Sequence, residues 1–200
     1  MSKQGDNRPQ RVVLGVTGAS GSIYAQQLLV MLSAHERVGE VVLVMSDNGK
    51  RVWNYELGAL PQESAKVRFE DNHNLFADVA SGSVRAMGMI IAPCSMSTLG
   101  RIAHGVGDNL ICRAADVMLK ERRPLVVIPR EMPLSLIHIE SMRQLTLAGG
   151  IVCPASPTFY GRPQNIGDAV RTVAERTLDL MGLDTPAQRW GGGLGGSQLL

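Results

Sequence analysis

The stretch that decides the fold reads Leu119-Lys-Glu-Arg-Arg-Pro-Leu-Val-Val-Ile-Pro-Arg-Glu-Met-Pro133. Its centre, Leu125–Ile128, is an aliphatic run without polar alternation, which is typical of a strand buried on both faces of a parallel sheet. Such a strand ends at the carboxyl edge of the sheet, where open α/β sheets bind ligands. Arg130 and Glu131 follow it directly, held between two prolines that restrict the backbone. The stretch therefore predicts an anion-binding site with an acid beside it.

Similar aliphatic runs alternate with helical patterns along the rest of the chain. This alternation predicts right-handed β-α-β units and a three-layer α/β/α sandwich, a doubly wound parallel sheet of the Rossmann or flavodoxin-like class. The expected strands are Arg11–Val16, Glu40–Met45, Lys66–Phe69, Met87–Ala92, Leu125–Ile128 and Ile151–Cys153. The expected helices are Ser22–Ala34, Gly49–Leu57, Leu75–Ala80, Ser97–His104, Asn109–Glu121, Leu134–Ala148 and Ile166–Met181.

The 200 residues contain no internal repeat and no linker, so we expect one domain over residues 11–190. Residues 1–10 are expected to be a flexible N-terminus and residues 191–200 a loose glycine-rich tail. The net charge is only +2, with Lys and Arg nearly balanced by Asp and Glu, and aromatic residues make up 4%. This composition argues against a nucleic-acid partner, because such proteins concentrate positive charge on one face.

The three cysteines, Cys94, Cys112 and Cys153, are odd in number and lack the spacing of a metal site. We therefore expect reduced thiols and a cytoplasmic protein. The four histidines share no metal-ligand spacing either, so no metal is expected. The first ten residues do not resemble a signal peptide, and no uncharged run approaches the ~20 residues of a membrane span.

The first expected strand runs into Thr17-Gly-Ala-Ser-Gly-Ser22, a short turn that opens a helix. Glycines allow a ligand to approach the backbone, and the free N–H groups at a helix start attract phosphate. The turn has neither the Lys-Ser/Thr of a Walker A loop nor the full G-x-G-x-x-G fingerprint. Phosphate binding and simple connection therefore both remain open for this turn.

A second hydroxyl-rich turn, Pro93-Cys-Ser-Met-Ser-Thr98, follows the fourth expected strand. In a doubly wound sheet the turns after the first and fourth strands face the same crevice. Ser95, Ser97 and Thr98 are candidates to bind a phosphate or a ring edge, although helix N-capping alone would need only one of them. Together the two turns favour a mononucleotide, which Ser46, at the end of the second strand, is expected to reach from the side.

The cations of the opening stretch divide into two kinds. Arg122 and Arg123 flank the end of a helix, where positive charge is favourable without any ligand, so we interpret them as structural. Arg130 instead follows a buried strand, and a guanidinium suits bidentate contact with phosphate oxygens.

Taken together these motifs resemble the UbiX-type flavin prenyltransferases over roughly residues 11–190. The Leu-Lys-Glu-Arg-Arg-Pro and Pro-Arg-Glu motifs are specific in combination, whereas the glycine turn alone is not. The matching segments are Val16-Thr-Gly-Ala-Ser-Gly21, Ser81-Gly-Ser83, Pro93-Cys-Ser95, Arg113-Ala-Ala-Asp116, Leu119-Lys-Glu-Arg-Arg-Pro-Leu125, Pro129-Arg-Glu131, Phe159-Tyr160, Pro163-Gln164 and Arg189-Trp190.

The resemblance implies an enzyme that moves a dimethylallyl group from dimethylallyl monophosphate to N5 and C6 of reduced FMN. The product, prenylated FMN, serves a UbiD-type decarboxylase in ubiquinone synthesis or aromatic-acid breakdown. It further implies a homododecamer with active sites shared between subunits, and no metal. An Asp-rich Mg²⁺ motif of the kind used for diphosphates is absent from the sequence, which agrees with a clamp of cationic side chains on a monophosphate.

The resemblance also assigns roles to individual residues. Glu131 would be the acid beside the leaving phosphate, and Ser20 would be part of a proton relay near flavin N5. Glu56 falls where the family has an acidic residue implicated in ring closure, within the less typical segment Trp53-Asn-Tyr55. The FMN residues would be Gly18, Ala19, Ser20, Ser46, Ser95, Met96, Ser97, Thr98 and Arg130. The donor residues would be Tyr160, Arg176, Arg113 and Trp190, with Lys120 from a neighbouring subunit.

Two other functions remain open at this point. A flavin-dependent decarboxylase of cysteine-like substrates usually carries Pro-Ala-Ser-Ala-Asn-Thr, and here Ser97 stands in place of the Asn. A non-enzymatic, flavodoxin-like electron carrier tends to be acidic and has no need of Arg130, Arg176 and Lys120 together.

Overall fold

Six parallel strands form a single sheet in the order β3-β2-β1-β4-β5-β6 in the computed structural model, which describes residues 10–185. The expectations for residues 1–9 and 191–200 and for Trp190 lie outside this range. The strands are β1 Gln10–Val16, β2 Val38–Met45, β3 Val67–Asp71, β4 Gly88–Cys94, β5 Leu125–Pro129 and β6 Ile151–Val152. The helices are α1 Ser22–Ala34, α2 Asp47–Leu57, η1 Asp78–Ala80, α3 Met96–Ala103, α4 Leu110–Lys120, α5 Leu136–Leu147 and α6 Ile166–Leu180.

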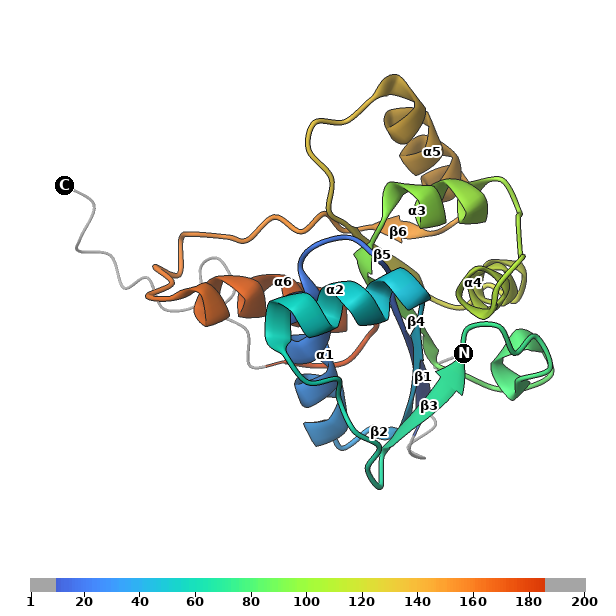
Figure 1. Cartoon of the computed structure of the whole chain (residues 1–200), viewed down its shortest axis with the longest axis horizontal. Coiled ribbons are helices and arrows are strands. Elements are labelled where there is room, and N and C mark those ends of the chain that lie inside the picture. Colours follow the sequence, from blue (N-terminus) through green and yellow to red (C-terminus); the bar gives the residue numbers. More distant parts are fainter. Residues whose placement is uncertain (1–9, 186–200) are drawn as a thin grey trace, which may run out of the picture.

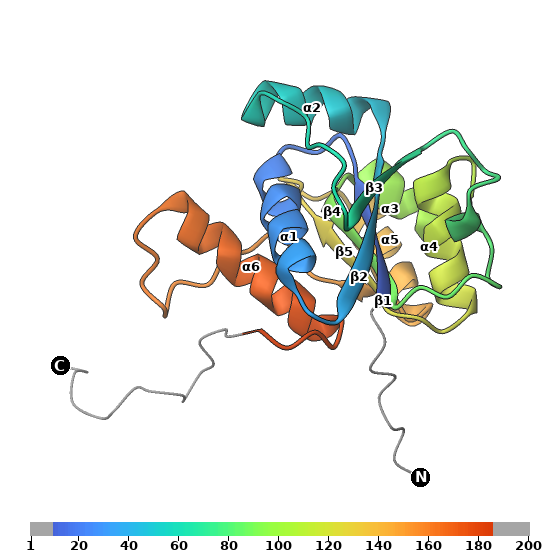
Figure 2. The same ribbon diagram turned by 90° about the horizontal axis from the view of Figure 1, so that it is seen from below.

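Helices cover both faces of this sheet, which confirms the three-layer α/β/α prediction (Figures 1 and 2). On one face α1 and α6 pack on Leu14, Leu43 and Ile128. On the other face α3, α4 and α5 pack on Val13 and Val127. Every side chain of Leu125–Ile128 is fully buried, as the run without alternation predicts.

One predicted helix is wrong. Residues 75–80 contain only the three-residue 3₁₀ turn η1, because Leu75 and Phe76 point their apolar side chains outward and Phe76 is fully exposed. The Asn74 side chain also accepts a hydrogen bond from the Phe76 N–H at 3.1 Å, which favours a turn over a continuing helix.

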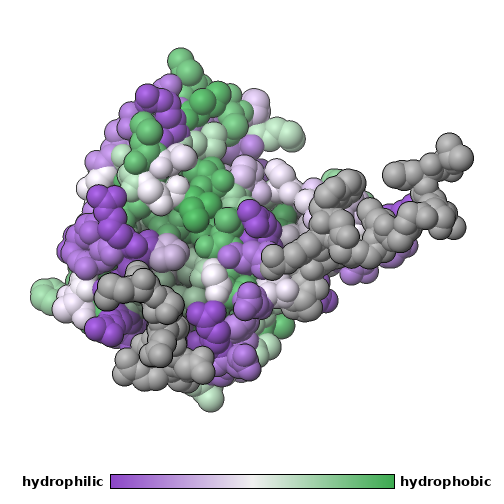
Figure 3. Space-filling model, turned by 180° about the vertical axis from the view of Figure 1, so that it is seen from behind, coloured by the Kyte–Doolittle hydropathy of each residue, from purple (hydrophilic) through white to green (hydrophobic). Residues whose placement is uncertain are grey.

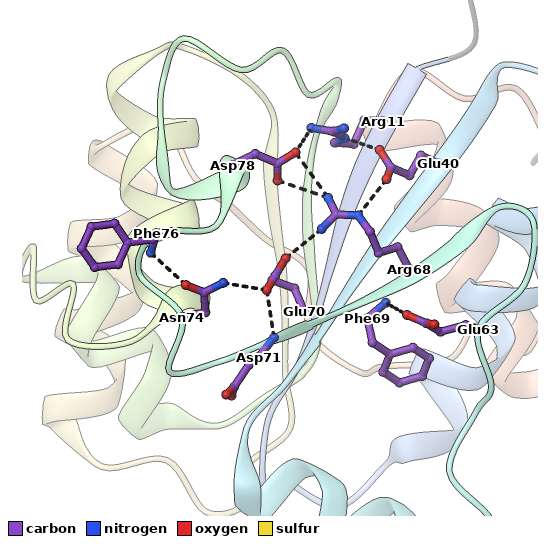
Figure 4. Close-up of polar contacts among 10 residues, drawn as sticks. All are labelled: Arg11, Glu40, Glu63, Arg68, Phe69, Glu70, Asp71, Asn74, Phe76 and Asp78. Atoms are coloured by element: carbon purple, nitrogen blue, oxygen red, sulfur yellow. Dashed lines mark hydrogen bonds and ion pairs between the residues drawn. The ribbon is translucent and has the colours of Figure 1, made fainter.

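A network of ion pairs connects the segment after β3, which contains η1, to the sheet (Figure 4). Glu40 on β2 accepts from Arg11 on β1 and from Arg68 on β3, the latter at 2.9 Å. Both arginines also reach Asp78 of η1, at 2.8 and 3.2 Å. Partial burial opposes the ionisation of Glu40, but hydrogen bonds from Arg68 and Arg11 hold its pKa below the usual value. The network therefore joins three strands and the segment after β3.

None of the helices among residues 10–185 combines the length and apolar character that crossing a membrane requires.

Candidate active site

The carboxyl edge of the sheet carries the first turns of three helices. The order places β1 beside β4 at the centre, and the chain leaves these two strands toward opposite faces, which is the switch point where doubly wound sheets bind ligands. Helices α1, α2 and α3 begin there, after β1, β2 and β4. The starts of helices favour an anion at this edge.

Hydroxyl groups cap two of these helices. Ser46 Oγ accepts from the Gly49 N–H at 3.0 Å, and Ser95 Oγ accepts from the Thr98 N–H at 3.4 Å. Ser95 Oγ also lies 3.0 Å from Thr98 Oγ1 and 3.2 Å from the hydroxyl of the exposed Ser97. N-capping therefore accounts for one hydroxyl in each turn, and Ser97 and Thr98 add further polar groups at the same edge.

Thr17 ties the two central turns together. Its hydroxyl, in a residue only 2% exposed, donates to the Pro93 carbonyl oxygen at 2.8 Å and accepts from the Ser95 N–H at 2.8 Å. Thr17 begins the glycine turn after β1, but no pattern in the sequence predicted this role. Both partners belong to the second turn, so Thr17 fixes the spacing of the two loops at the switch point.

Glycine is required where the β1–α1 turn meets α2. A Cβ on Gly18 would lie 2.6 Å from the Cβ of Asn48, and one on Gly49 would lie 2.6 Å from the Val16 carbonyl oxygen. Gly21, which precedes α1, has a φ of 112°, a conformation that glycine adopts at little cost. Gly18 and Gly49 therefore let the β1–α1 turn and the start of α2 come into close contact.

Arg130 reaches the β1–α1 turn from the end of β5. Its Nε donates to the Ser20 carbonyl oxygen at 3.0 Å, and its own N–H donates to the Cys94 carbonyl oxygen at 3.3 Å. The Ser20 side chain is exposed at this edge, whereas Ala19 beside it is buried. Arg130 therefore joins the turns after β1, β4 and β5.

Glu56, near the end of α2, lies over the first turn of α1. Its carboxylate accepts from the Gly21 N–H at 3.0 and 3.1 Å and from the Ser22 N–H at 2.8 Å. Partial burial opposes ionisation, but hydrogen bonds from the Ser20 hydroxyl and from these N–H groups hold the pKa of Glu56 below the usual value. An ionised carboxylate thus contacts Ser20, although the two residues are far apart in the sequence.

The remaining predicted site residues lie in different parts of the structure. Glu131 is exposed next to Arg130, and its Oε1 accepts from the Met132 N–H at 3.2 Å. The Met96 side chain is buried in the core on the α3 face, so only its main chain faces the edge, and its predicted contact with FMN is restricted to backbone atoms. Tyr160 lies after β6, and Arg176 is exposed on α6.

Two cations on α4 are not brought to this site. Lys120 ends α4 just before β5 begins, which places it at the amino edge of the sheet, and its Nζ lies 2.6 Å from Glu121. Arg113 donates to the Ala80 carbonyl oxygen at 3.2 Å and to Asp116 at 2.8 Å. Within one chain, then, Lys120 and Arg130 lie at opposite edges of the sheet.

Arg122 and Arg123 have the structural role that was expected. Arg122 takes a left-handed φ of 56° just after α4, and the Arg123 N–H donates to the Met118 carbonyl oxygen at 2.9 Å, which closes the helix. The Arg123 guanidinium donates to the carbonyl oxygens of Gly82 and Val84 at 2.8 and 2.7 Å.

The chain is similar to known proteins in sequence and in structure. A family model described as Flavoprotein matches residues 1–178. The chain is 41% identical to the flavin prenyltransferase UbiX of Methanocaldococcus jannaschii over 184 residues, covering 90% of this chain and 98% of the relative.

The chain belongs to the UbiX-type flavin prenyltransferase family.

Two solved structures of similar proteins support this membership. AnUbiX (PadA1) in complex with FMN and dimethylallyl pyrophosphate is 42% identical, with a TM-score of 0.87 over 92% of this chain and 99% of that one. A dodecameric FMN-dependent UbiX-like decarboxylase from Escherichia coli O157:H7 is 41% identical, with a TM-score of 0.84 over 91% of this chain and 100% of that one. The family identified from sequence motifs is confirmed.

Proposed function

We propose that this protein is a flavin prenyltransferase, which moves a dimethylallyl group from dimethylallyl monophosphate to N5 and C6 of reduced FMN. The observation that carries the proposal is the convergence of Ser20, Glu56 and Arg130 at the start of α1, at the switch point of the sheet. In a chain of this family, that arrangement supplies a flavin site with proton-exchanging groups beside it.

The residues at the carboxyl edge fit FMN. Helix N-termini, capping hydroxyls and a guanidinium suit a phosphate and the polar edge of a ring. Gly18 lets the turn that carries Ala19 and Ser20 pack closely against α2. Reduced FMN supplies the electron-rich atoms that receive the prenyl group. The residues that would hold it are Gly18, Ala19, Ser20, Ser46, Ser95, Ser97, Thr98 and Arg130, with Met96 through its main chain.

On the donor side we assign a clamp of cationic and phenolic groups. Tyr160 and Arg176 would bind the phosphate, which stabilises the charge that develops as it leaves. Glu131, exposed beside Arg130, would give that phosphate its proton. On the flavin side, the carboxylate of Glu56 would take up a proton through Ser20. Protonation of the leaving group and deprotonation of the acceptor are thus assigned to different carboxyl groups.

Lys120 and Arg113 would complete the donor site of a neighbouring subunit. The amino-edge position of Lys120 supports this assignment, because Lys120 lies away from the Arg130 of its own chain. We therefore propose a homo-oligomer with shared sites, a dodecamer like the E. coli relative.

An exposed apolar surface supports association of this kind. Met132 and Leu136, 86% and 72% exposed, belong to α5 and the loop before it, as does Ile137 at 76%. Figure 3 shows hydrophobic residues gathered at the top of the molecule, where α5 lies in Figure 1. Burying such side chains against another copy would remove apolar area from water.

Subunit complementation tests the shared site. Lys120→Ala and Glu131→Gln chains, each inactive alone, should regain activity when they are unfolded together and reassembled, because some sites then combine both intact residues. A mixture of two Glu131→Gln preparations is the matched control and should stay inactive. If the mixed variants also stay inactive while they assemble normally, Lys120 does not act across an interface.

We also propose that the product serves a UbiD-type decarboxylase in the cytoplasm. A flavin-free decarboxylase of that type should gain activity from the filtrate of a reaction containing this protein, reduced FMN and dimethylallyl monophosphate. Omitting the donor is the control. If the filtrate of the complete reaction contains prenylated FMN but does not activate the decarboxylase, the proposed delivery step is wrong. The transferase activity is unaffected by that result.

A further inference from the structure

Ser22, the first residue of α1, carries a hydroxyl that the site described so far does not use. The residue is 1% exposed, and within residues 10–185 its Oγ has no hydrogen-bond partner. Native structures rarely leave a buried hydroxyl unpaired, because its desolvation is then uncompensated. The backbone N–H of the same residue donates to Glu56 at 2.8 Å. The residue that carries the unpaired hydroxyl is therefore bound to the Glu56 carboxylate through its backbone.

The surroundings of Glu56 offer mostly neutral donors. The Ser20 hydroxyl and the N–H groups of Gly21 and Ser22 contact it from the β1–α1 turn and from α1. Arg130 approaches from the end of β5, where it binds the Ser20 carbonyl oxygen. On α1, the ring of Tyr24 lies beside Gly21, and burial raises the pKa of that phenol. Among the described residues, no charged side chain belongs to the groups that shift the pKa of Glu56.

We propose that Ser22 is a positioning residue for Glu56: rotation about its Cα–Cβ bond turns the buried hydroxyl onto the carboxylate and fixes it over the first turn of α1. Ser22 keeps its own proton throughout and acts only as a donor. This role deepens the proposed function and rests on it, because the carboxylate held in place is the one assigned to take up a proton through Ser20.

A hydrogen bond from the Ser22 hydroxyl would determine whether the ionised or the protonated form of Glu56 is favoured. A hydroxyl that donates to a carboxylate stabilises the charged form and so lowers its pKa. The Ser22 N–H already lowers the pKa of Glu56, and the hydroxyl, once turned onto the carboxylate, adds to this effect. With the hydroxyl in place, Glu56 stays ionised and ready to accept a proton over a wider range of pH.

The test measures the titration of Glu56 in the flavin-free protein by ¹³C NMR of labelled glutamate carboxyl groups, with Glu56→Gln to assign the signal. Ser22→Ala removes the hydroxyl and keeps the N–H, so the pKa of Glu56 should move upward. Ser22→Thr keeps a hydroxyl and should leave it near the wild-type value. Ser33→Ala is the matched control, because the Ser33 hydroxyl donates to the Leu29 carbonyl oxygen of the same helix at 2.7 Å.

An unchanged Glu56 titration in folded Ser22→Ala overturns the proposal. If Ser22→Ala does not fold, Ser22→Cys, whose thiol is a weak donor, must show the upward shift of the Glu56 pKa instead. With flavin and donor added, the acidic limb of the pH–rate profile should move upward in Ser22→Ala while the affinity for FMN stays the same. The titration needs neither substrate, so its failure and the failure of the transferase assay are distinguishable.

Discussion

Replacing Thr17 with Val tests whether the two central turns form one site. Val keeps the shape of the side chain but removes a hydroxyl that makes two hydrogen bonds of 2.8 Å, in a residue 2% exposed. The Ser95 N–H is left unpaired, which costs about 1–3 kcal/mol. The Pro93 carbonyl oxygen still accepts from the backbone N–H of residue 17 at 3.3 Å, so the bond lost there costs about 1 kcal/mol, and we expect a total loss of about 2–4 kcal/mol.

For a chain of this size, about 2–4 °C of Tm is lost per kcal/mol, so Thr17→Val should melt roughly 4–16 °C below wild type. The melts are compared at equal protein concentration, because assembly contributes to stability. Thr17→Ser, which keeps the hydroxyl and loses one methyl group, is the control and should lose only about 1 kcal/mol. Thr17→Val should also bind FMN more weakly than Thr17→Ser, since the turns are no longer tied.

The reasoning is refuted if Thr17→Val and Thr17→Ser melt together and bind FMN with equal affinity. The two turns would then be held in place without the Thr17 hydroxyl.

Three further predictions concern other parts of the chain. Arg130→Met should weaken FMN binding measured by fluorescence titration, because it removes the guanidinium bound to the Ser20 carbonyl oxygen at 3.0 Å, and an unchanged affinity would contradict the assignment. The pKa of Glu40 is lowered in the folded protein, so its ion pairs stabilise the fold at neutral pH and are lost as the pH falls through that pKa. In urea unfolding experiments Glu40→Gln should therefore be less stable than wild type at neutral pH, and the difference should be smaller in acid. Burial raises the pKa of all three thiols, but only Cys153 is partly exposed, so iodoacetamide should modify it before Cys94 and Cys112, and simultaneous labelling would argue against this packing.

Local patterns in the sequence were sufficient to predict the sheet. The unbroken aliphatic run Leu125–Ile128 indicated a strand buried on both faces, and the predicted helix Ser22–Ala34 matches α1 at both ends. Residues 75–80 were mispredicted because apolar residues usually face a core, whereas Phe76 points into solvent. A short apolar segment does not reveal which way its side chains point.

Less of the site than of the sheet could be predicted from the sequence. Gly18, Ser95 and Arg130 follow strands directly, so the topology alone brings them to one edge. Glu56 ends a helix far from Ser20, and only the packing of α2 over α1 shows that the two meet. The tie made by Thr17 was missed for the same reason, because its partners lie in another turn. The predicted helix and strand placed Lys120 before the strand and Arg130 after it, which agrees with their positions at opposite edges of the sheet.

The mass of the flavin after an anaerobic reaction tests the central claim most directly. The protein is incubated with reduced FMN and dimethylallyl monophosphate, and the extracted flavin is analysed by mass spectrometry, with Arg176→Ala as the variant expected to lose donor binding more than FMN binding. We predict a flavin enlarged by one five-carbon dimethylallyl unit. Unmodified FMN, recovered from wild-type protein that demonstrably bound it, would contradict the account.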